Sequence, residues 1–222
     1  LMIRLPPRST QSRSSAASDV YKRQDHGPGF SQQYTNQIRK FNLIENNGQV
    51  SIENYSSVTD SLLLHRRDYN LLMQLDNDGK EMLSIYSGVF QYSKDVPFTT
   101  LIDIDENGYR EVPGFNQQFS HYHTATFAAY NNKTKTMYSI FFGGIAQNYK
   151  DSSGNTVKDN DIPFVKTISV VERSDNKVKE YVLPEKLSGY FGAAAEFISV
   201  NEKLFAENGI MNLSLIHISE PT

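Results

Sequence analysis

The stretch Asn77-Asp78-Gly79-Lys80-Glu81-Met82-Leu83-Ser84-Ile85-Tyr86-Ser87-Gly88 has a second copy at residues 132–143, with six identical positions. The offset between the copies is 55 residues (132 − 77). Two shorter internal similarities accompany them: residues 44–48 resemble 104–108, and residues 96–98 resemble 162–164. Self-similarity at such a period predicts a repeat architecture, in which each unit buries its apolar face against the next.

Both copies predict a hairpin of two β-strands joined by a turn rich in Asn, Asp and Gly. The runs Leu71-Leu72-Met73 and Ile140-Phe141-Phe142 are continuously apolar, which is typical of central strands covered on both faces. No segment predicts a helix, since Asn, Gly and β-branched residues interrupt every candidate. We therefore expect an all-β fold whose strands recur in three groups: 37–44, 49–55, 67–75 and 81–90; 98–103, 109–112, 124–130 and 136–142; 164–172, 178–183, 193–200 and a strand ending at 206.

The two ends of the chain differ from its middle. Residues 1–24 and 214–222 resemble translated sequencing adapter and have no apolar period, so we expect both to be non-native tails outside the fold. The whole chain has a formal net charge of −3, and removing the tails leaves 17 basic and 23 acidic residues, a net charge of −6, in residues 25–213. An acidic, mixed surface argues against nucleic acid as a partner.

Two further absences narrow the class of protein. The chain contains no cysteine, which excludes disulfides and thiolate metal sites. No run of residues approaches the roughly 20 apolar residues of a membrane-spanning helix, so no membrane span is expected. Motifs for a serine nucleophile, a phosphate loop or a zinc protease are also absent, and no catalytic residue, metal or cofactor is predicted.

Residues 119–130, followed by 137–144, resemble a kelch blade. The shared features are a His or Arg before a strand, a short hairpin, and an aromatic-rich strand that closes on Gly143-Gly144. The earlier copy, residues 64–69 and 82–88, keeps one glycine of the pair. The resemblance covers roughly residues 34–210 and implies a partial β-propeller of about three four-stranded antiparallel blades, here assigned to 25–213.

The resemblance has departures. The kelch tryptophan is missing, the spacing is long, and about 11 residues are inserted around 148–161. The resemblance nevertheless implies a bacterial protein that is secreted, periplasmic or on the cell surface. Three blades cannot close a ring, so missing blades of the same chain are among the expected partners.

Six residues are candidates for a ligand site. His121 and His123 lie two apart and would share a face of a strand, where they could bind a metal or simply hydrogen-bond backbone. His65, Arg66 and Arg67 occupy the matching position of the first copy. An arginine there could clamp a carboxylate or form an inter-blade ion pair with Asp68. Tyr149 lies in the inserted segment.

These observations favour a binding or scaffold module that recognises a protein or an extracellular glycan through its blade-connecting loops. The alternative is a propeller enzyme acting on sugars or sugar acids, of the epimerase, lyase or oxidase type. That alternative requires His65, Arg67, His121 and His123 to converge at one mouth.

Overall fold

The structure, a computed structural model, describes residues 34–175, 177–191, 195–199 and 201–214. It contains two compact units, residues 1–66 and 67–222, which are described separately below. Within the described residues the regular structure is β-strand, apart from short 3-10 segments at η2 (Glu202–Leu204) and at residues 213–214, so the predicted all-β class is confirmed. Of the predicted tails 1–24 and 214–222, residues 1–24 and 215–222 lie outside the described residues, whereas Ser214 is described and its amide donates to Asn212 Oδ1 at 3.0 Å.

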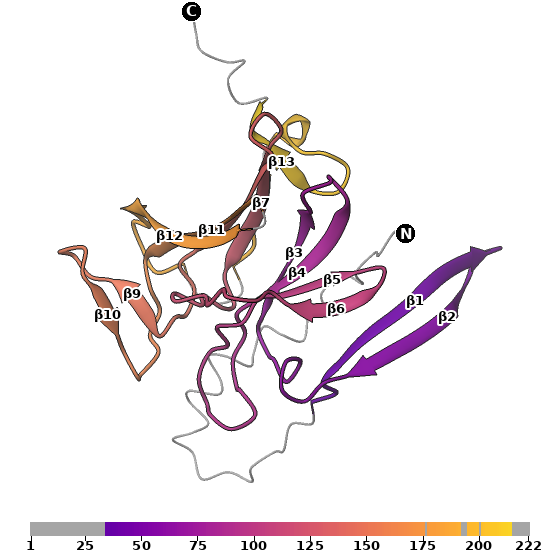
Figure 1. Cartoon of the computed structure of the whole chain (residues 1–222), viewed down its shortest axis with the longest axis horizontal. Helices are drawn as coiled ribbons and strands as arrows, with labels where there is room; N and C mark the ends of the chain where they lie inside the picture. The colour runs from indigo at the N-terminus through magenta and orange to yellow at the C-terminus, as the bar shows by residue number, and fades with distance from the viewer. Residues whose placement is uncertain (1–33, 176, 192–194, 200, 215–222) are drawn as a thin grey trace, which may run out of the picture. The chain divides into compact units, whose positions relative to one another are not determined.

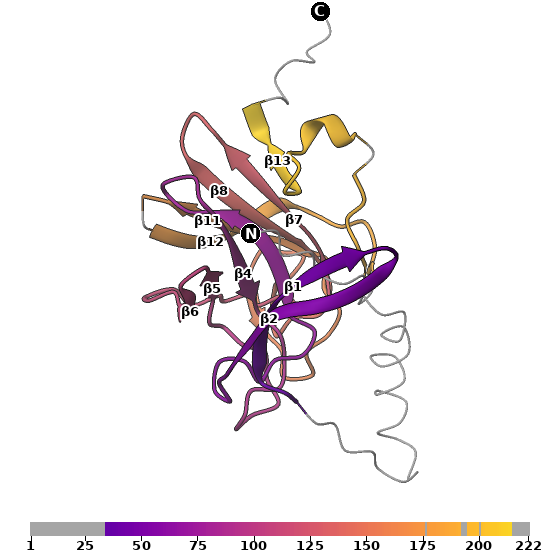
Figure 2. The same cartoon turned by 90° about the vertical axis from the view of Figure 1, so that its right-hand side faces the viewer.

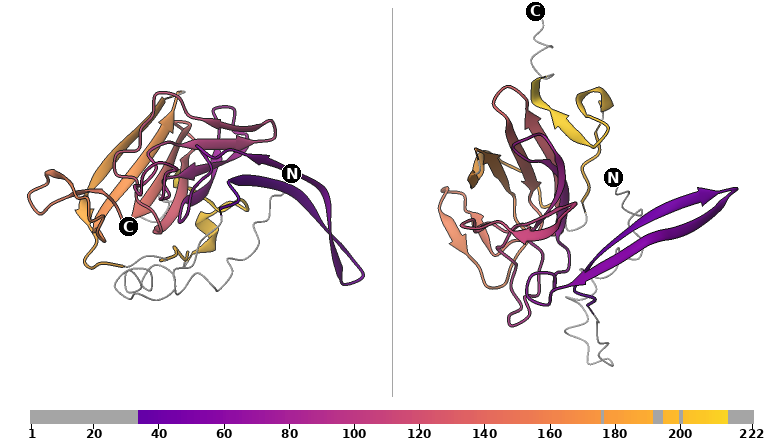
Figure 3. Two further views of the ribbon diagram at one scale, coloured as in Figure 1. Left: turned by 90° about the horizontal axis from the view of Figure 1, so that it is seen from below. Right: turned by 45° about the vertical axis from the view of Figure 1, so that its right-hand side comes forward.

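The first unit contains one antiparallel hairpin, β1 (Gln37–Asn46) and β2 (Gln49–Thr59). Its turn residues Asn47 and Gly48 both have positive φ, 52° and 79°, the geometry that matches the twist of two-residue hairpins. The Glu45 carboxylate accepts a hydrogen bond from the Gly48 amide at 2.8 Å. The hairpin is a long twisted ribbon with a largely exposed surface, as Figure 3 shows.

The first sheet of the second unit is an antiparallel meander in the order β3-β4-β5-β6. Its inner-facing side chains alternate along β3, where Asn70, Leu72 and Gln74 are buried. This grouping corrects the expectation that β1 and β2 share a sheet with β3, because β4 pairs instead with the strand that follows it. The strands are β3 (Asn70–Leu75), β4 (Glu81–Tyr86), β5 (Ile102–Asp105) and β6 (Gly108–Glu111).

The second sheet has the order β12-β11-β8-β7-β13 (Figure 1). Strands β7, β8, β11 and β12 form a second antiparallel meander, and β13 lies parallel to β7 (Figure 2). The separate hairpin β9–β10 is inserted between β8 and β11. The strands are β7 (Ala125–Asn131), β8 (Thr136–Phe142), β9 (Asn148–Lys150), β10 (Thr156–Lys158), β11 (Thr167–Ser174), β12 (Lys177–Lys186) and β13 (Ile210–Asn212).

The sequence repeat is also a repeat of backbone geometry. Each copy begins with an isolated antiparallel bridge, Arg67 to Val89 in the first and Tyr122 to Ile145 in the second. A residue with left-handed backbone follows each bridge, Asp68 with φ 56° and its counterpart His123 with φ 51°. The hairpins β3–β4 and β7–β8 come next. The two copies thus approach their first strands along the same path.

The third strand group differs from the prediction. Residues 195–199 form no strand, η2 lies where a returning strand was expected, and β13 pairs in parallel rather than as a hairpin. The Asn201 side chain caps η2 by accepting from the Lys203 amide at 3.2 Å, which favours a turn over an extended strand. The predicted hairpin over 193–206 is therefore wrong for the part of that segment the structure describes.

The core lies between the two meanders. Leu72, Tyr86 and Leu101 of the first sheet region meet Phe141 and Val171 of the second. Tyr86 and Phe141 pack edge to face, with ring centroids 5.2 Å apart.

The predicted two-sided cover of the Ile140-Phe141-Phe142 run is confirmed. Phe141 is fully buried toward the first sheet. On the other face, the Phe142 ring stacks on Phe127 at 5.7 Å and lies 6.5 Å from Phe197. Apolar side chains therefore cover both faces of β8, as expected of a central strand.

Gly144 is expected to be the least replaceable glycine of the repeat. Its φ is +75°, and an added Cβ would lie 2.8 Å from the Tyr122 carbonyl oxygen, which the bridge to Ile145 holds in place. Gly144→Ala should lower the free energy of unfolding by about 2–3 kcal/mol, from left-handed strain plus the clash. Gly79, with φ +80° and open space around its Cβ position, is the matched control and should lose only about 1 kcal/mol in urea unfolding. Equal losses would contradict the crowding argument.

Candidate functional site

The beginnings of β3 and β7 meet in what we call the strand-start cluster: Arg67, Asp68, Phe90, Tyr122 and His123. The Asp68 carboxylate lies 3.1 Å from Arg67 Nε and 3.8 Å from His123 Nδ1. The His123 amide donates to the Asp68 carbonyl at 3.0 Å. The Arg67 guanidinium lies 5.3 Å from the centroid of the Phe90 ring. One carboxylate thus joins two consecutive repeats.

The electrostatics of the strand-start cluster suit a structural joint. Burial raises the pKa of the Tyr122 hydroxyl, the Asp68 carboxylate raises it further, and Arg67 partly opposes both. The tyrosine is therefore protonated at neutral pH and does not act as a base. Asp68 and His123 are strained non-glycine residues, and such strain persists only where surrounding contacts hold it. Here the Arg67–Asp68 ion pair, the His123 ring beside the same carboxylate, and the hydrogen bond from the His123 amide supply those contacts.

His121 and His123 do not lie on one strand, which corrects the premise of the sequence prediction that they share a strand face. Both residues precede β7, and the left-handed backbone of Ser120 (φ 43°) and His123 removes the alternation of an extended strand. The His121 ring is fully buried, edge-on to Phe119 at 6.4 Å, and neither ring nitrogen has a hydrogen-bond partner among the described residues. Burial lowers its pKa to about 3.

His65 and Arg66 belong to the first unit, where both have local partners. His65 Nδ1 lies 2.8 Å from Asn36 Oδ1, and its ring lies 4.2 Å from the Tyr34 ring. Arg66 is buried and its Nε donates to the Leu63 carbonyl at 2.7 Å. Of the three residues of the enzyme alternative that belong to the second unit, Arg67 and His123 both lie within 4 Å of the Asp68 carboxylate.

Tyr149 lies on β9 of the inserted hairpin and pairs with Val157 of β10. The hairpin projects at the end of the second sheet in Figures 1 and 3. Its turn is ordered by Asp151, whose carboxylate accepts from the Ser153 and Asn155 amides at 2.9 and 2.8 Å. The insertion predicted around 148–161 is therefore a defined β-element, well suited to present side chains to a partner.

Sequence reasoning missed Glu180, which fastens the linker before β7 onto β12. Its Oε2 accepts from the amides of Gln118 at 2.5 Å and Phe119 at 3.1 Å. Burial raises the Glu180 pKa to about 7, although these two hydrogen bonds favour the charged form. The available signal was its position between Val178 and Val182, where alternation places an acid among inward-facing residues.

A second missed feature is a buried ion pair between the sheets. Asp103 on β5 receives two hydrogen bonds from the Arg173 guanidinium on β11, at 2.8 and 2.9 Å. Ser84 Oγ donates to the same carboxylate at 2.6 Å. Only 3% of the Asp103 side chain and 13% of the Arg173 side chain are exposed, so this pair holds the sheets in one register.

Neither the grouping of side chains nor the comparisons with known proteins assigns a chemistry to these residues. Across the described ranges, no three His, Asp or Glu side chains gather as a metal site. Within the same residues, no helix is long and apolar enough to cross a membrane. Comparisons of the chain with protein-family models, curated proteins and solved structures yield no match.

Proposed function

We propose that the chain is part of a kelch-like β-propeller and acts as a binding or scaffold module, in a bacterial protein that is secreted, periplasmic or on the cell surface. Its partner is a protein or an extracellular glycan, bound through the loops and the inserted hairpin. Two stacked antiparallel meanders, each preceded by the same bridge and left-handed residue, support the repeat assignment.

The observation that carries the binding function is that the side chains of the strand-start cluster contact one another, whereas those of the inserted hairpin project from the sheet. Arg67 and His123 both lie within 4 Å of the Asp68 carboxylate, and so both side chains serve the joint between repeats. The inserted hairpin, in contrast, places Tyr149 and neighbouring polar side chains on a defined projection from the sheet. Rigid sheets that present an ordered projection are the usual arrangement of a recognition surface.

The enzyme alternative has less support. An acid–base site needs groups whose pKa values lie near the working pH and that reach a common substrate atom. Burial holds the pKa of His121 at about 3, and its ring lacks polar partners in the described part of the chain. Burial likewise keeps the Tyr122 hydroxyl protonated.

Affinity electrophoresis through gels that contain neutral or acidic polysaccharides tests the proposal. The chain should be retarded by at least one polysaccharide, and Tyr149→Ala should weaken that retardation by about tenfold in apparent Kd. Tyr92→Ala, at a residue that is 68% exposed in another loop, is the matched control and should bind as the original chain does.

Two results would contradict the proposal. Retardation that Tyr149→Ala and Tyr92→Ala leave equally intact would place binding away from the inserted hairpin. Turnover of a sugar acid that His123→Ala abolishes, with the fold intact by circular dichroism, would favour the enzyme. If no polysaccharide retards the chain, the glycan part of the proposal falls.

A further inference from the structure

The hairpin β1–β2 holds the same place in the order of elements as the hairpin β5–β6. The two resemble each other around the turn, where residues 44–48 are similar to 104–108. Each is followed along the chain by an isolated bridge, a residue with left-handed backbone and then a new hairpin, β3–β4 or β7–β8. β1–β2 therefore has the position of the hairpin that closes a repeat.

The closing hairpins of the second unit are joined to the hairpins that precede them. β5 pairs antiparallel with β4, and β11 pairs antiparallel with β8, so that each repeat forms one continuous sheet. β1 is the counterpart of β5 and β11, but within the described residues β2 is its only strand partner. The other edge of β1 thus lacks the strand that its counterparts have.

The burial of these strands differs in the same way. Ile102 of β5 is fully buried, and Val170 and Val171 of β11 are at most 3% exposed. No residue of β1 is buried, and β2 is exposed along its whole length. The difference follows from the number of strands in each sheet, because a two-stranded ribbon is marginally stable in water, whereas three or more strands with an apolar face can form a core.

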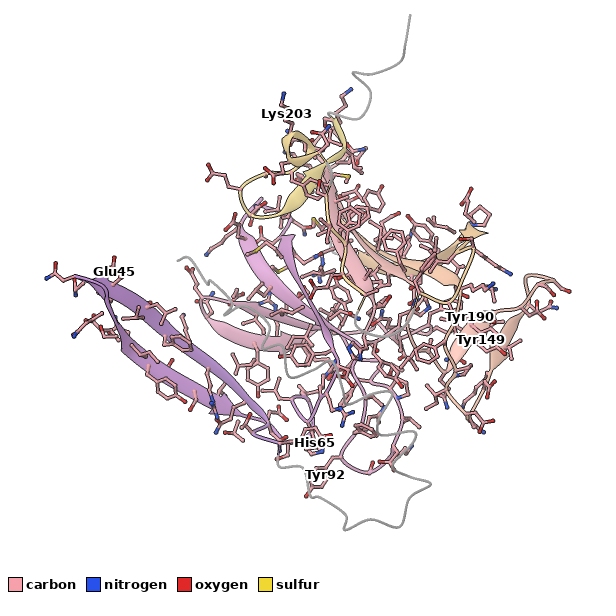
Figure 4. The ribbon with its side chains drawn as sticks, turned by 180° about the vertical axis from the view of Figure 1, so that it is seen from behind. Glu45, His65, Tyr92, Tyr149, Tyr190 and Lys203 are labelled. Carbon is pink, nitrogen blue, oxygen red and sulfur yellow. The ribbon has the colours of Figure 1, made fainter. Side chains whose placement is uncertain are left out.

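The exposed ribbon has an apolar face. Leu43 lies directly opposite Ile52, and Val50 is two residues from Ile52, so the three side chains point to the same face. Leu43, Ile52 and Val50 are 50%, 58% and 68% exposed. Figure 4 shows side chains standing out from both faces of this ribbon, with Glu45 near its turn. A long edge strand beside an exposed apolar face is a site for the addition of a further strand.

We propose that the free edge of β1 pairs with the second strand of an antiparallel β-hairpin that precedes it in the same polypeptide. The preceding hairpin is the fitting occupant because β3–β4 and β7–β8 each come before the hairpin with which they pair. Its second strand has the pattern of β4 and β8, in which Met-x-Ser-Ile is followed by an aromatic residue, as at residues 82–86 and 137–141. The inference rests on the proposed function, since it uses the repeat assignment, and it names the element through which a missing repeat attaches.

A tandem chain supplies the missing strand. A duplicate of residues 67–98 is placed directly before Tyr34, so that residues 34–36 replace residues 99–101, which separate Phe98 from β5. The β1 amides that do not bond to β2 should then exchange with solvent at least about tenfold more slowly than in the original chain, as measured by hydrogen exchange. The matched control carries Ile85→Pro in the duplicate alone. Because proline interrupts the ladder of a central strand, the β1 amides of this control should exchange as they do in the original chain.

A peptide of residues 67–98 gives a second measurement that does not depend on folding of the tandem chain. Added in excess to the original chain, it should slow exchange of the same β1 amides, and the Ile85→Pro peptide should not. Exchange of the β3 and β4 amides of the original chain should stay unchanged in both cases, since these strands already have partners.

Three outcomes would overturn the inference. Fast exchange of the β1 amides in both the tandem chain and the mixture with peptide would show that such a strand does not occupy this edge. Equal slowing by the Ile85→Pro duplicate would show that added residues, and not strand pairing, protect β1. Protection in the original chain that rises with its concentration, together with a dimer in sedimentation velocity, would assign the edge to a second copy of the chain.

The experiment also separates this inference from the proposed function. If β1 stays unprotected while a polysaccharide is retarded in a Tyr149-dependent manner, the inference fails and the proposed binding function stands. If the tandem chain protects β1 and no polysaccharide is retarded, the inference stands and the glycan part of the proposed function falls.

Discussion

Replacing Asp103 by alanine is expected to lower the free energy of unfolding by about 3–5 kcal/mol. The Arg173 guanidinium would remain buried between the sheets without the carboxylate that receives two of its hydrogen bonds. Ser84 Oγ would lose its acceptor as well. Urea unfolding followed by far-ultraviolet circular dichroism measures the loss as a lower midpoint.

Asp105→Ala is the matched control, two residues along the same strand. Asp105 pairs with Arg110, whose side chain is 54% exposed. An exposed pair contributes at most about 1 kcal/mol, because water and salt screen it. A similar cost for Asp103→Ala and Asp105→Ala would show that burial does not strengthen the dependence of Arg173 on its partner.

A double variant separates the net contribution of the ion pair to the free energy of unfolding from the penalty of leaving one charge buried without its partner. Asp103→Leu combined with Arg173→Leu removes both charges and should recover most of the stability that Asp103→Ala loses, since buried ion pairs are often no more stabilising than apolar residues of similar volume. Failure to recover would indicate that Ser84 or the fit of the two sheets contributes more than the charges do.

The parts of the fold that the sequence predicts well are those determined by local chemistry. Asn47-Gly48 supplies two residues with positive φ, and Asp76 with Gly79 closes the β3–β4 turn, so the hairpins can be found without tertiary information. The assignment of hairpins to sheets depends on contacts across long linkers, such as the pairing of β4 with β5. Strand patterns leave that choice open, and the prediction that β1 and β2 belong with β3 and β4 is wrong for this reason.

The candidate site likewise combines contacts between sequence neighbours, which can be predicted, with contacts between distant segments, which cannot. The ion pair of Arg67 with Asp68 joins adjacent residues and could be proposed from sequence, but its link to His123 spans a whole repeat. The irregular backbone that carries His121 and His123 could not be predicted, because neither Ser120 nor His123 is of a type that requires left-handed geometry.

His121→Phe is expected to remove a large part of the destabilisation of the chain by acid. Burial lowers the pKa of His121 from 6.5 to about 3, so between these values the unfolded chain binds a proton that the folded chain excludes. The stability is fully present above pH 6.5 and is lost as the pH falls toward 3. At about 1.4 kcal/mol per pH unit, roughly 3 kcal/mol is lost between pH 6.5 and 4.

Glu180 acts in the opposite direction over part of the same range. Burial raises its pKa from 4.5 to about 7, so the folded chain binds more protons than the unfolded chain, and stability falls as the pH rises between these values. The two contributions partly cancel between pH 4.5 and 6.5. In His121→Phe the Glu180 contribution stands alone, and stability should rise as the pH falls from 7 to 4.5.

Urea midpoints from pH 4 to 8 for the original chain, His121→Phe and Glu180→Gln test both signs. Glu180→Gln keeps an oxygen that can accept from the Gln118 and Phe119 amides, but the glutamine side chain does not titrate. The stability of this variant should therefore fall more steeply than that of the original chain as the pH is lowered. His121→Phe should also raise stability near pH 7, because a ring of similar size replaces two nitrogens that lack partners among the described residues. If the urea midpoint of His121→Phe falls between pH 6.5 and 4 as much as that of the original chain, the imidazole must reach water or a polar partner. Other groups would then cause the unfolding in acid.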